Sequence, residues 1–276
     1  AWSKSHDDEL TMVENFTQHS RENLDTGYAK IMLDGIPPTY TAALLEPYNP
    51  TPEFGENHFG KLMFEPNVLA KDVTKLDKLG LTVKIHATGD SSIRIALDAI
   101  EEARRINGDS GLLHEISHAE LIHPDDLPRF AKLNVAAEMC PILWYPGPAV
   151  DAMRIAMGDR ANQMWPVRSL VNSGALVFYG SDWPSVVPDT NPWPGIEAMV
   201  TRKDPYERFE GDYWLEEAVD LATALRIFTL NGATAGKQAA ETGSLEVGKA
   251  ADFIVLDRNP FTITADELSD VQAVYT

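Results

Sequence analysis

The stretch LTVKIHATGD, residues 81–90, is an apolar-rich run that ends at His86 and then breaks into Gly-Asp. Its polar residues alternate with Val83 and Ile85, which is the two-residue period of a strand. The residues that follow, 91–107, carry apolar side chains at helical spacing. The stretch therefore predicts a strand, a loop and a helix, with His86 at the carboxyl end of the strand. In a parallel α/β fold, that end of a strand is where chemistry takes place.

The same unit recurs along the chain. Further strands are predicted at residues 28–35, 112–122, 135–139 and 175–181, and further helices at 66–79, 124–133, 166–173 and 215–236. Such alternation predicts a parallel sheet with right-handed crossovers, either an open doubly wound sheet or part of a (β/α)8 barrel. The sequence contains no glycine-rich phosphate loop that would favour the open sheet.

Two local expectations complete the assignment of elements. Ser91 or Ser92 is the expected N-cap of the helix at residues 91–107. Near the C-terminus, residues 243–257 predict two short strands joined at Gly248-Lys249, and residues 271–275 predict one more. The last part of the chain is therefore expected to be of β type.

Composition and charge exclude several classes of protein. The chain has 276 residues, 44% of them hydrophobic, which is enough for one large domain and a small appendage. A net charge of −19 argues against nucleic acid and against an anionic membrane surface as partners, because both would repel the chain. The single cysteine, Cys140, excludes an internal disulfide and a cysteine-based zinc cluster. One cysteine fits a reducing compartment, so a cytoplasmic location is favoured.

Four residues lie at or near the ends of predicted strands: Lys30, His86, His118 and Asp182. Histidines and carboxylates are good ligands for zinc or a similar divalent ion, and a catalytic site keeps one position open for water. A lone histidine is more often a hydrogen-bonded core residue, and a lone aspartate at a strand end is usually a turn former. Their shared position at the same end of successive strands predicts a metal site.

Residues 114–118, HEISH, permit a different interpretation. On a helix, H-E-x-x-H would bind zinc through both histidines and use Glu115 as the general base of a metallopeptidase. A helix there would directly follow another helix and break the alternation, so we favour a strand in which Ile116 and both histidines share a face. A serine hydrolase has less support, because G-x-S-x-G is absent. Cys140 with a histidine is a candidate nucleophile pair, although a single cysteine on an apolar strand is more often a packing residue.

Five segments resemble a known family: AKIMLDG, VKIHATGD, HEISHAELIHPDD, YGSDWP and GSLEVGKAADFIVLD. They are similar to the C-terminal half of the amidohydrolase superfamily, specifically amidohydrolase family 3, which includes N-substituted formamide deformylase-like and exoenzyme-regulatory-protein-like members. The resemblance covers nearly the whole chain. It implies that residues 1–238 form part of a (β/α)8 TIM barrel, about strands four to eight, and that residues 239–276 supply strands of a small composite β-sandwich domain.

The resemblance also implies a metal site and a reaction. His86 and His118 match the family's histidines after the fifth and sixth strands, and Asp182 matches the aspartate after the eighth. Lys30 matches the lysine whose carboxylated side chain bridges two metals. The implied enzyme is a metal-dependent hydrolase of non-peptide carbon–nitrogen bonds with one or two ions, most readily zinc. Metal-bound water attacks an amide-type carbonyl of a small molecule, and Asp182 relays the proton to the leaving nitrogen.

The chain departs from the family pattern at three places. Ser117 stands where relatives usually have glutamate, and Cys140 where they commonly have glutamine, so both departures concern substrate preference. The first-strand H-x-H pair has no counterpart, because His6 and His19 do not form it. We therefore expect a fragment that is inactive alone and is completed by a missing N-terminal segment or by self-association. The alternative from a different class is a non-catalytic regulatory or binding protein that keeps the scaffold.

Overall fold

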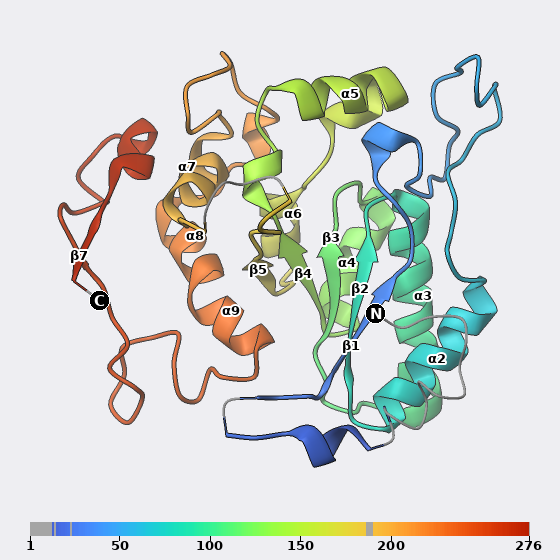
Figure 1. Cartoon of the computed structure of the whole chain (residues 1–276), viewed down its shortest axis with the longest axis horizontal. Coiled ribbons are helices and arrows are strands. Elements are labelled where there is room, and N and C mark those ends of the chain that lie inside the picture. The colour runs from blue at the N-terminus through green and yellow to red at the C-terminus, as the bar shows by residue number, and fades with distance from the viewer. Residues whose placement is uncertain (1–12, 14, 23, 186–189, 276) are drawn as a thin grey trace. The chain divides into compact units, whose positions relative to one another are not determined.

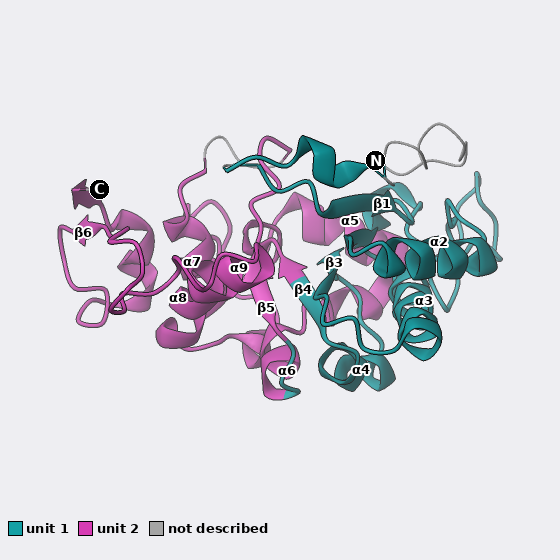
Figure 2. Ribbon diagram, turned by 90° about the horizontal axis from the view of Figure 1, so that it is seen from below, with its two compact units in different colours: residues 1–137, 173–175 teal, residues 138–172, 176–276 magenta. Residues whose placement is uncertain are grey.

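The structure is a computed structural model of the chain, and it describes residues 13, 15–22, 24–185 and 190–275 (Figure 1). The chain divides into two compact units (Figure 2). Unit 1 comprises residues 1–137 and 173–175, and unit 2 comprises residues 138–172 and 176–276.

The central feature is a five-stranded sheet whose strands follow one another in chain order, β1-β2-β3-β4-β5. The strands are β1 (Tyr28–Met32), β2 (Thr82–Ala87), β3 (His114–His118), β4 (Val135–Met139) and β5 (Val177–Tyr179). β1 pairs with β2, and β2 with β3, in parallel. The predicted α/β fold with a parallel sheet is therefore confirmed, and the predicted bounds of β4 agree with the structure.

In unit 1, two helices lie side by side and both contact β2 (Figure 1): α2 (Pro66–Lys78) and α3 (Asp90–Asn107). α2 buries Leu69, Val73 and Leu76, as the three- and four-residue spacing predicts. The N-cap of α3 is Gly89, so the prediction of Ser91 or Ser92 was wrong. Both serine N–H groups instead donate to the carbonyl oxygen of Ala43, at 3.1 and 3.3 Å, which places them inside the first turn.

The predicted helix at residues 124–133 is two short elements, η3 (Pro124–Asp126) and α4 (Leu127–Lys132). Pro128 lies in the first turn of α4, where its missing N–H group is tolerated, but it cannot donate the hydrogen bond that would continue an α-helix from residue 124. The described part of unit 1 also contains the 3-10 turns η1 (Phe16–His19) and η2 (Pro37–Thr39).

Unit 2 contains mostly short helices. They are η4 (Pro141–Leu143), α5 (Pro148–Met157), η5 (Gly158–Asn162), α6 (Val167–Asn172), α7 (Trp193–Thr201), η6 (Leu215–Glu217), α8 (Leu221–Phe228), α9 (Leu230–Ala235) and η7 (Ala265–Asp270). The pattern did not predict α5. The helix predicted at 215–236 is interrupted at Thr229, whose φ of −124° and ψ of −90° are not helical.

At the end of unit 2, β6 (Val255–Leu256) and β7 (Ala273–Tyr275) form an antiparallel pair. The two strands predicted within residues 243–257 are reduced to β6 alone, because residues 243–254 form turns, bends and irregular chain. None of the helices in the described residues combines the length and apolar character required to cross a lipid bilayer.

Candidate metal centre

One face of the sheet in unit 1 carries a row of polar side chains. On β2, Lys84 lies opposite Lys30 of β1 and opposite Glu115 of β3. His86, also on β2, lies opposite Ser117 of β3. The Nζ of Lys30 donates a hydrogen bond of 2.9 Å to the Oγ of Ser117. The Nζ of Lys84 lies 3.3 Å from a carboxylate oxygen of Glu115. The strands therefore bring Lys30 and His86 to neighbouring positions on one face.

His86 and His118 lie together at the carboxyl ends of β2 and β3. Their ring centroids are 4.6 Å apart and their planes meet at 68°, an edge-to-face arrangement. His118 has a left-handed backbone, with φ of 70°, so its side chain departs from the alternation of β3. The prediction that His118, Ile116 and His114 share a face was therefore wrong.

The hydrogen bond of His86 defines which ring nitrogen carries its proton. The Nε2 of His86 lies 3.0 Å from the carbonyl oxygen of Gly35. A carbonyl oxygen only accepts, so Nε2 donates, and in the neutral ring Nδ1 keeps its lone pair. Histidines that bind metals have this arrangement, with one nitrogen donating to the protein and the other directed to the ion.

The other two candidate ligands have different surroundings. Lys30 is held by Ser117, as described above. Asp182 belongs to unit 2, three residues beyond the end of β5, where it is exposed and has φ of 53°. Its carbonyl oxygen accepts a hydrogen bond of 2.8 Å from the N–H of Ser185. The structure thus brings Lys30, His86 and His118 together within unit 1.

The histidine pair fits part of a zinc site. Two neutral imidazoles are suitable ligands for a divalent ion, whereas a catalytic zinc site uses three protein ligands. Across residues 13, 15–22, 24–185 and 190–275, no cluster of three or more histidine, cysteine, aspartate or glutamate side chains is close enough to hold a metal ion. His86 and His118 therefore supply two ligands of the kind that zinc prefers.

His114 does not belong to this site. Residues 114–118 form the strand β3 rather than a helix, so the metallopeptidase interpretation of H-E-x-x-H was wrong. Both ring nitrogens of the fully buried His114 are occupied: Nδ1 accepts from the N–H of Val83 at 3.1 Å, and Nε2 donates to Asp77 at 3.0 Å. Extended chain separates the two histidines along the strand, whereas a helix would have stacked them on one face.

Sequence reasoning missed Asp34 as a residue of this site. Its fully buried carboxylate lies 3.7 Å from the Nε2 of His86 and accepts hydrogen bonds from Ala43, Gly89 and Ser92. Burial raises the pKa of the Asp34 carboxyl, and these hydrogen bonds oppose that rise. The signal in the sequence was the Asp-Gly pair that follows the strand next to the one bearing His86.

The chain belongs to the amidohydrolase family, whose sequence model matches residues 2–276. Protein LONG AFTER FAR-RED 3 of Arabidopsis thaliana is 31% identical over 255 residues, which is 92% of this chain and 42% of that protein. The N-substituted formamide deformylase of Arthrobacter pascens is 29% identical over 223 residues, which is 80% of this chain and 40% of that protein. The chain thus spans about two-fifths of the length of both relatives.

The chain is also similar to solved structures. An uncharacterised metal-dependent hydrolase from Pyrococcus furiosus superimposes with a TM-score of 0.72 and 26% identity, over 91% of this chain and 50% of that one. Family membership and this neighbour therefore agree on the fold of the chain.

Proposed function

We propose that this chain forms part of a metal-dependent hydrolase that cleaves non-peptide carbon–nitrogen bonds in small amide-type molecules. The observation that carries the proposal is the pair His86 and His118, with rings 4.6 Å apart at the carboxyl ends of two parallel strands. The similarity to an N-substituted formamide deformylase supports the choice of an amide-type bond.

Each side chain has a defined role in this proposal. A divalent ion, most readily zinc, supplies a Lewis acid that lowers the pKa of bound water. His86 would hold it through Nδ1, together with His118. Lys30, held by Ser117 on the second strand along the sheet, is the residue we propose to be carboxylated and to provide a bridging anion. Asp182 would accept the proton of the attacking water and deliver it to the leaving nitrogen.

Metal content of the purified protein tests this function directly. We expect one or two zinc ions per chain after reconstitution with zinc and gel filtration, measured by elemental analysis, and loss of metal in His86→Ala and in His118→Ala. His123→Ala is the matched control, because His123 is partly exposed and only caps η3. No zinc in the chain alone, with zinc bound once a complementing N-terminal polypeptide is present, would place the further ligands in that polypeptide. No zinc in either case would contradict the hydrolase proposal and favour the non-catalytic regulatory or binding protein.

The larger architecture is also a proposal. The five parallel strands correspond to about strands four to eight of a (β/α)8 barrel, with residues 1–238 in the barrel and residues 239–276 in a small β-domain. If the barrel needs additional strands from another polypeptide, this chain is inactive on its own. Hydrolase activity on amides is therefore expected only when a complementing polypeptide is present.

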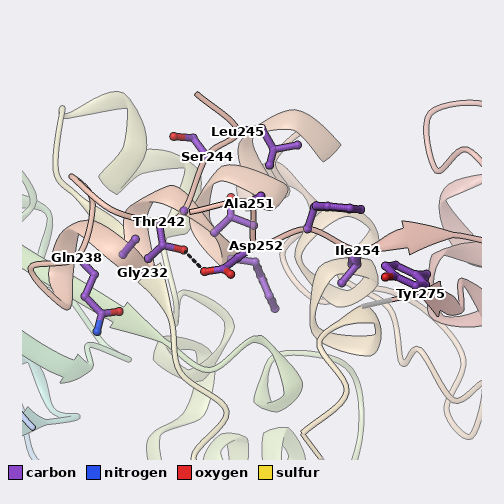
Figure 3. A pocket seen from close by; sticks show the side chains of 14 residues that line it. Gly232, Gln238, Thr242, Ser244, Leu245, Ala251, Asp252, Ile254 and Tyr275 are labelled. Carbon is purple, nitrogen blue, oxygen red and sulfur yellow. Dashed lines mark hydrogen bonds between the residues drawn. The ribbon is translucent and has the colours of Figure 1, made fainter. Parts of the chain in front are cut away.

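Unit 2 exposes apolar side chains where such a polypeptide would bind. Phe253, Ile254 and Tyr275 are 47, 52 and 64% exposed, beside a cavity of about 1010 Å³ (Figure 3). Monomeric proteins rarely leave large contiguous apolar patches exposed. We propose that the occupant is a strand from the part of the relatives' sequence that lies outside the match, which is more than half of each relative.

Co-expression tests this occupant. The chain should co-purify with the N-terminal half of the Arthrobacter pascens deformylase, and Ile254→Asp should abolish co-purification because it places a charge in the interface. Lys71→Ala, which changes an exposed side chain of unit 1, is the control. Sedimentation of the chain alone as a stable dimer that Ile254→Asp dissociates would contradict the proposal in favour of a second copy.

A further inference from the structure

We propose that Asp34, acting with Thr88 on the carbonyl group of Gly35, is a positioning residue that keeps the proton of His86 on Nε2 and leaves Nδ1 unprotonated. The value of this arrangement for metal binding rests on the proposed function. The arrangement itself is a property of the metal-free protein.

The electrostatic part of the argument comes from the position of the Asp34 carboxylate. The carboxylate is fully buried, and its Oδ1 lies 3.7 Å from the Nε2 of His86. Interactions between charges and dipoles are stronger away from water. The negative charge therefore favours the tautomer whose N–H group is directed toward it, which is the Nε2–H form.

A closed set of hydrogen bonds fixes the ring. The carbonyl oxygen of Gly35 accepts from the Nε2 of His86 at 3.0 Å and from the hydroxyl of Thr88 at 2.7 Å. The backbone N–H of Thr88 in turn donates to the Oδ1 of Asp34 at 3.1 Å. Asp34 and Gly35 are consecutive residues, so the carboxylate and the carbonyl group that meet Nε2 are held on one short segment.

The second oxygen of Asp34 anchors the surrounding backbone. Its Oδ2 accepts from the N–H groups of Ala43 and Gly89, at 3.0 and 3.1 Å, and from the hydroxyl of Ser92 at 2.6 Å. Gly89 approaches the loop so closely that a Cβ there would lie 2.0 Å from the carbonyl oxygen of Ala43. The end of β1, the first turn of α3 and the loop at residue 43 therefore converge on one carboxylate.

This set of donors requires a carboxylate rather than an amide. Both oxygens of Asp34 face N–H or O–H donors, and the oxygens of an ionised carboxylate only accept. An asparagine would direct its NH₂ group at one set of donors and leave them unsatisfied in the buried site. Asp34→Asn therefore changes hydrogen bonding and charge with almost no change in volume.

The test is nitrogen NMR of ¹⁵N-histidine-labelled, metal-free protein at neutral to mildly alkaline pH. The chain has seven histidines, and the His86→Gln spectrum identifies the signals of His86. In the wild type, His86 should show a single tautomer with Nε2 protonated. In Asp34→Asn, it should show a mixture of tautomers. The control is Asp126→Asn, which alters another buried carboxylate of unit 1, bonded to Arg94 and Arg129, and should leave the His86 signals unchanged.

Thr88 provides a second route if Asp34→Asn does not fold. Thr88→Val removes the hydroxyl bonded to Gly35 at nearly constant volume and should also mix the tautomers of His86, whereas Thr88→Ser should restore the wild-type spectrum. His86 signals that stay in the Nε2–H form in every folded variant of Asp34 and Thr88 would overturn the inference.

Zinc affinity separates this inference from the proposed function. In a competition titration, Asp34→Asn should bind zinc about 10–100-fold more weakly than the wild type, the usual effect of removing a residue that orients a ligand. A wild type with the Nε2–H tautomer but no zinc binding would contradict the proposed function and leave the assignment of Asp34 standing. Zinc binding that is unaffected by Asp34→Asn, with an unchanged tautomer, would refute the positioning role alone.

Discussion

Replacing His114 by alanine should destabilise the protein without weakening metal binding, whereas replacing His118 should do the opposite. The two histidines stand four positions apart in HEISH, and the sequence motif treats them as equivalent. The structure separates them: His114 is fully buried and bonded to Val83 and Asp77, and His118 is half-buried beside His86.

The expected magnitude follows from the hydrogen bonds and the packing that the His114 imidazole provides. His114→Ala leaves the N–H of Val83 buried without its acceptor, at a cost of about 1–3 kcal/mol. Asp77 loses one donor but keeps Arg104, Ser110 and Asn107, so its cost lies at the lower end of that range. The cavity left by the imidazole adds about 1–2 kcal/mol. Together we expect a loss of about 3–6 kcal/mol for His114→Ala and less than about 1 kcal/mol for His118→Ala.

Urea unfolding and zinc titration of both variants provide the assay. The change in the free energy of unfolding is read from the shift of the midpoint at constant slope. We expect the midpoint of His114→Ala to fall while its zinc stoichiometry stays at the wild-type value, and the reverse for His118→Ala. Loss of zinc in His114→Ala with an unfolding midpoint equal to that of the wild type would refute this assignment of roles.

Three further outcomes are expected. Burial raises the pKa of Asp77, but its hydrogen bonds, with that from His114 the largest, outweigh burial and hold the pKa well below its usual range. The carboxylate therefore stabilises the fold above pH about 4, and this contribution is lost at lower pH. In Asp77→Asn, the free energy of unfolding should depend less on pH in the acid range than in the wild type. Burial and then Glu115 raise the pKa of Tyr28 to about 12, so its contribution is lost as pH rises from about 10. Tyr28→Phe should therefore remove a step near pH 12 from an alkaline phenolate titration. Arg202, whose pKa burial lowers to about 10, is fully buried, and Arg202→Met should cost about 3 kcal/mol in urea unfolding because it leaves backbone carbonyl groups unsatisfied.

The elements of the sheet in unit 1 could be read from local patterns. The alternation around His86 predicted β2, and the spacing of Leu69, Val73 and Leu76 predicted α2. These patterns are local, because a strand repeats every two residues and a helix every 3.6, so a few neighbouring side chains reveal which face is buried. The helix α5 escaped this reasoning because its sequence, PAVDAMRIAM, begins within a proline- and glycine-rich stretch that is typical of a loop.

The residues that surround His86 could be predicted only in part. Candidate ligands were found because they end strands, and parallel strands place those ends at one edge of the sheet. The partners of these ligands come from distant parts of the chain: Lys30 bonds Ser117, 87 positions away, and Asp34 bonds Ser92, 58 positions away. Such pairs depend on strand register and on where loops dock, and neither is a property of a short stretch of sequence.

The sequence by itself thus determined the order of the five strands of the sheet, the family resemblance and the placement of His86 at a strand end. Only the tertiary structure decided that His114 stabilises the core while His118 joins His86, since the left-handed backbone at His118 redirects its side chain. It also decided that Asp34 is enclosed by donors from the loop at residue 43, the segment that follows β2 and the start of α3. The physical reason is that hydrogen bonding and burial of a side chain depend on the neighbours that folding brings to it, whereas periodicity depends on the chain's own repeat.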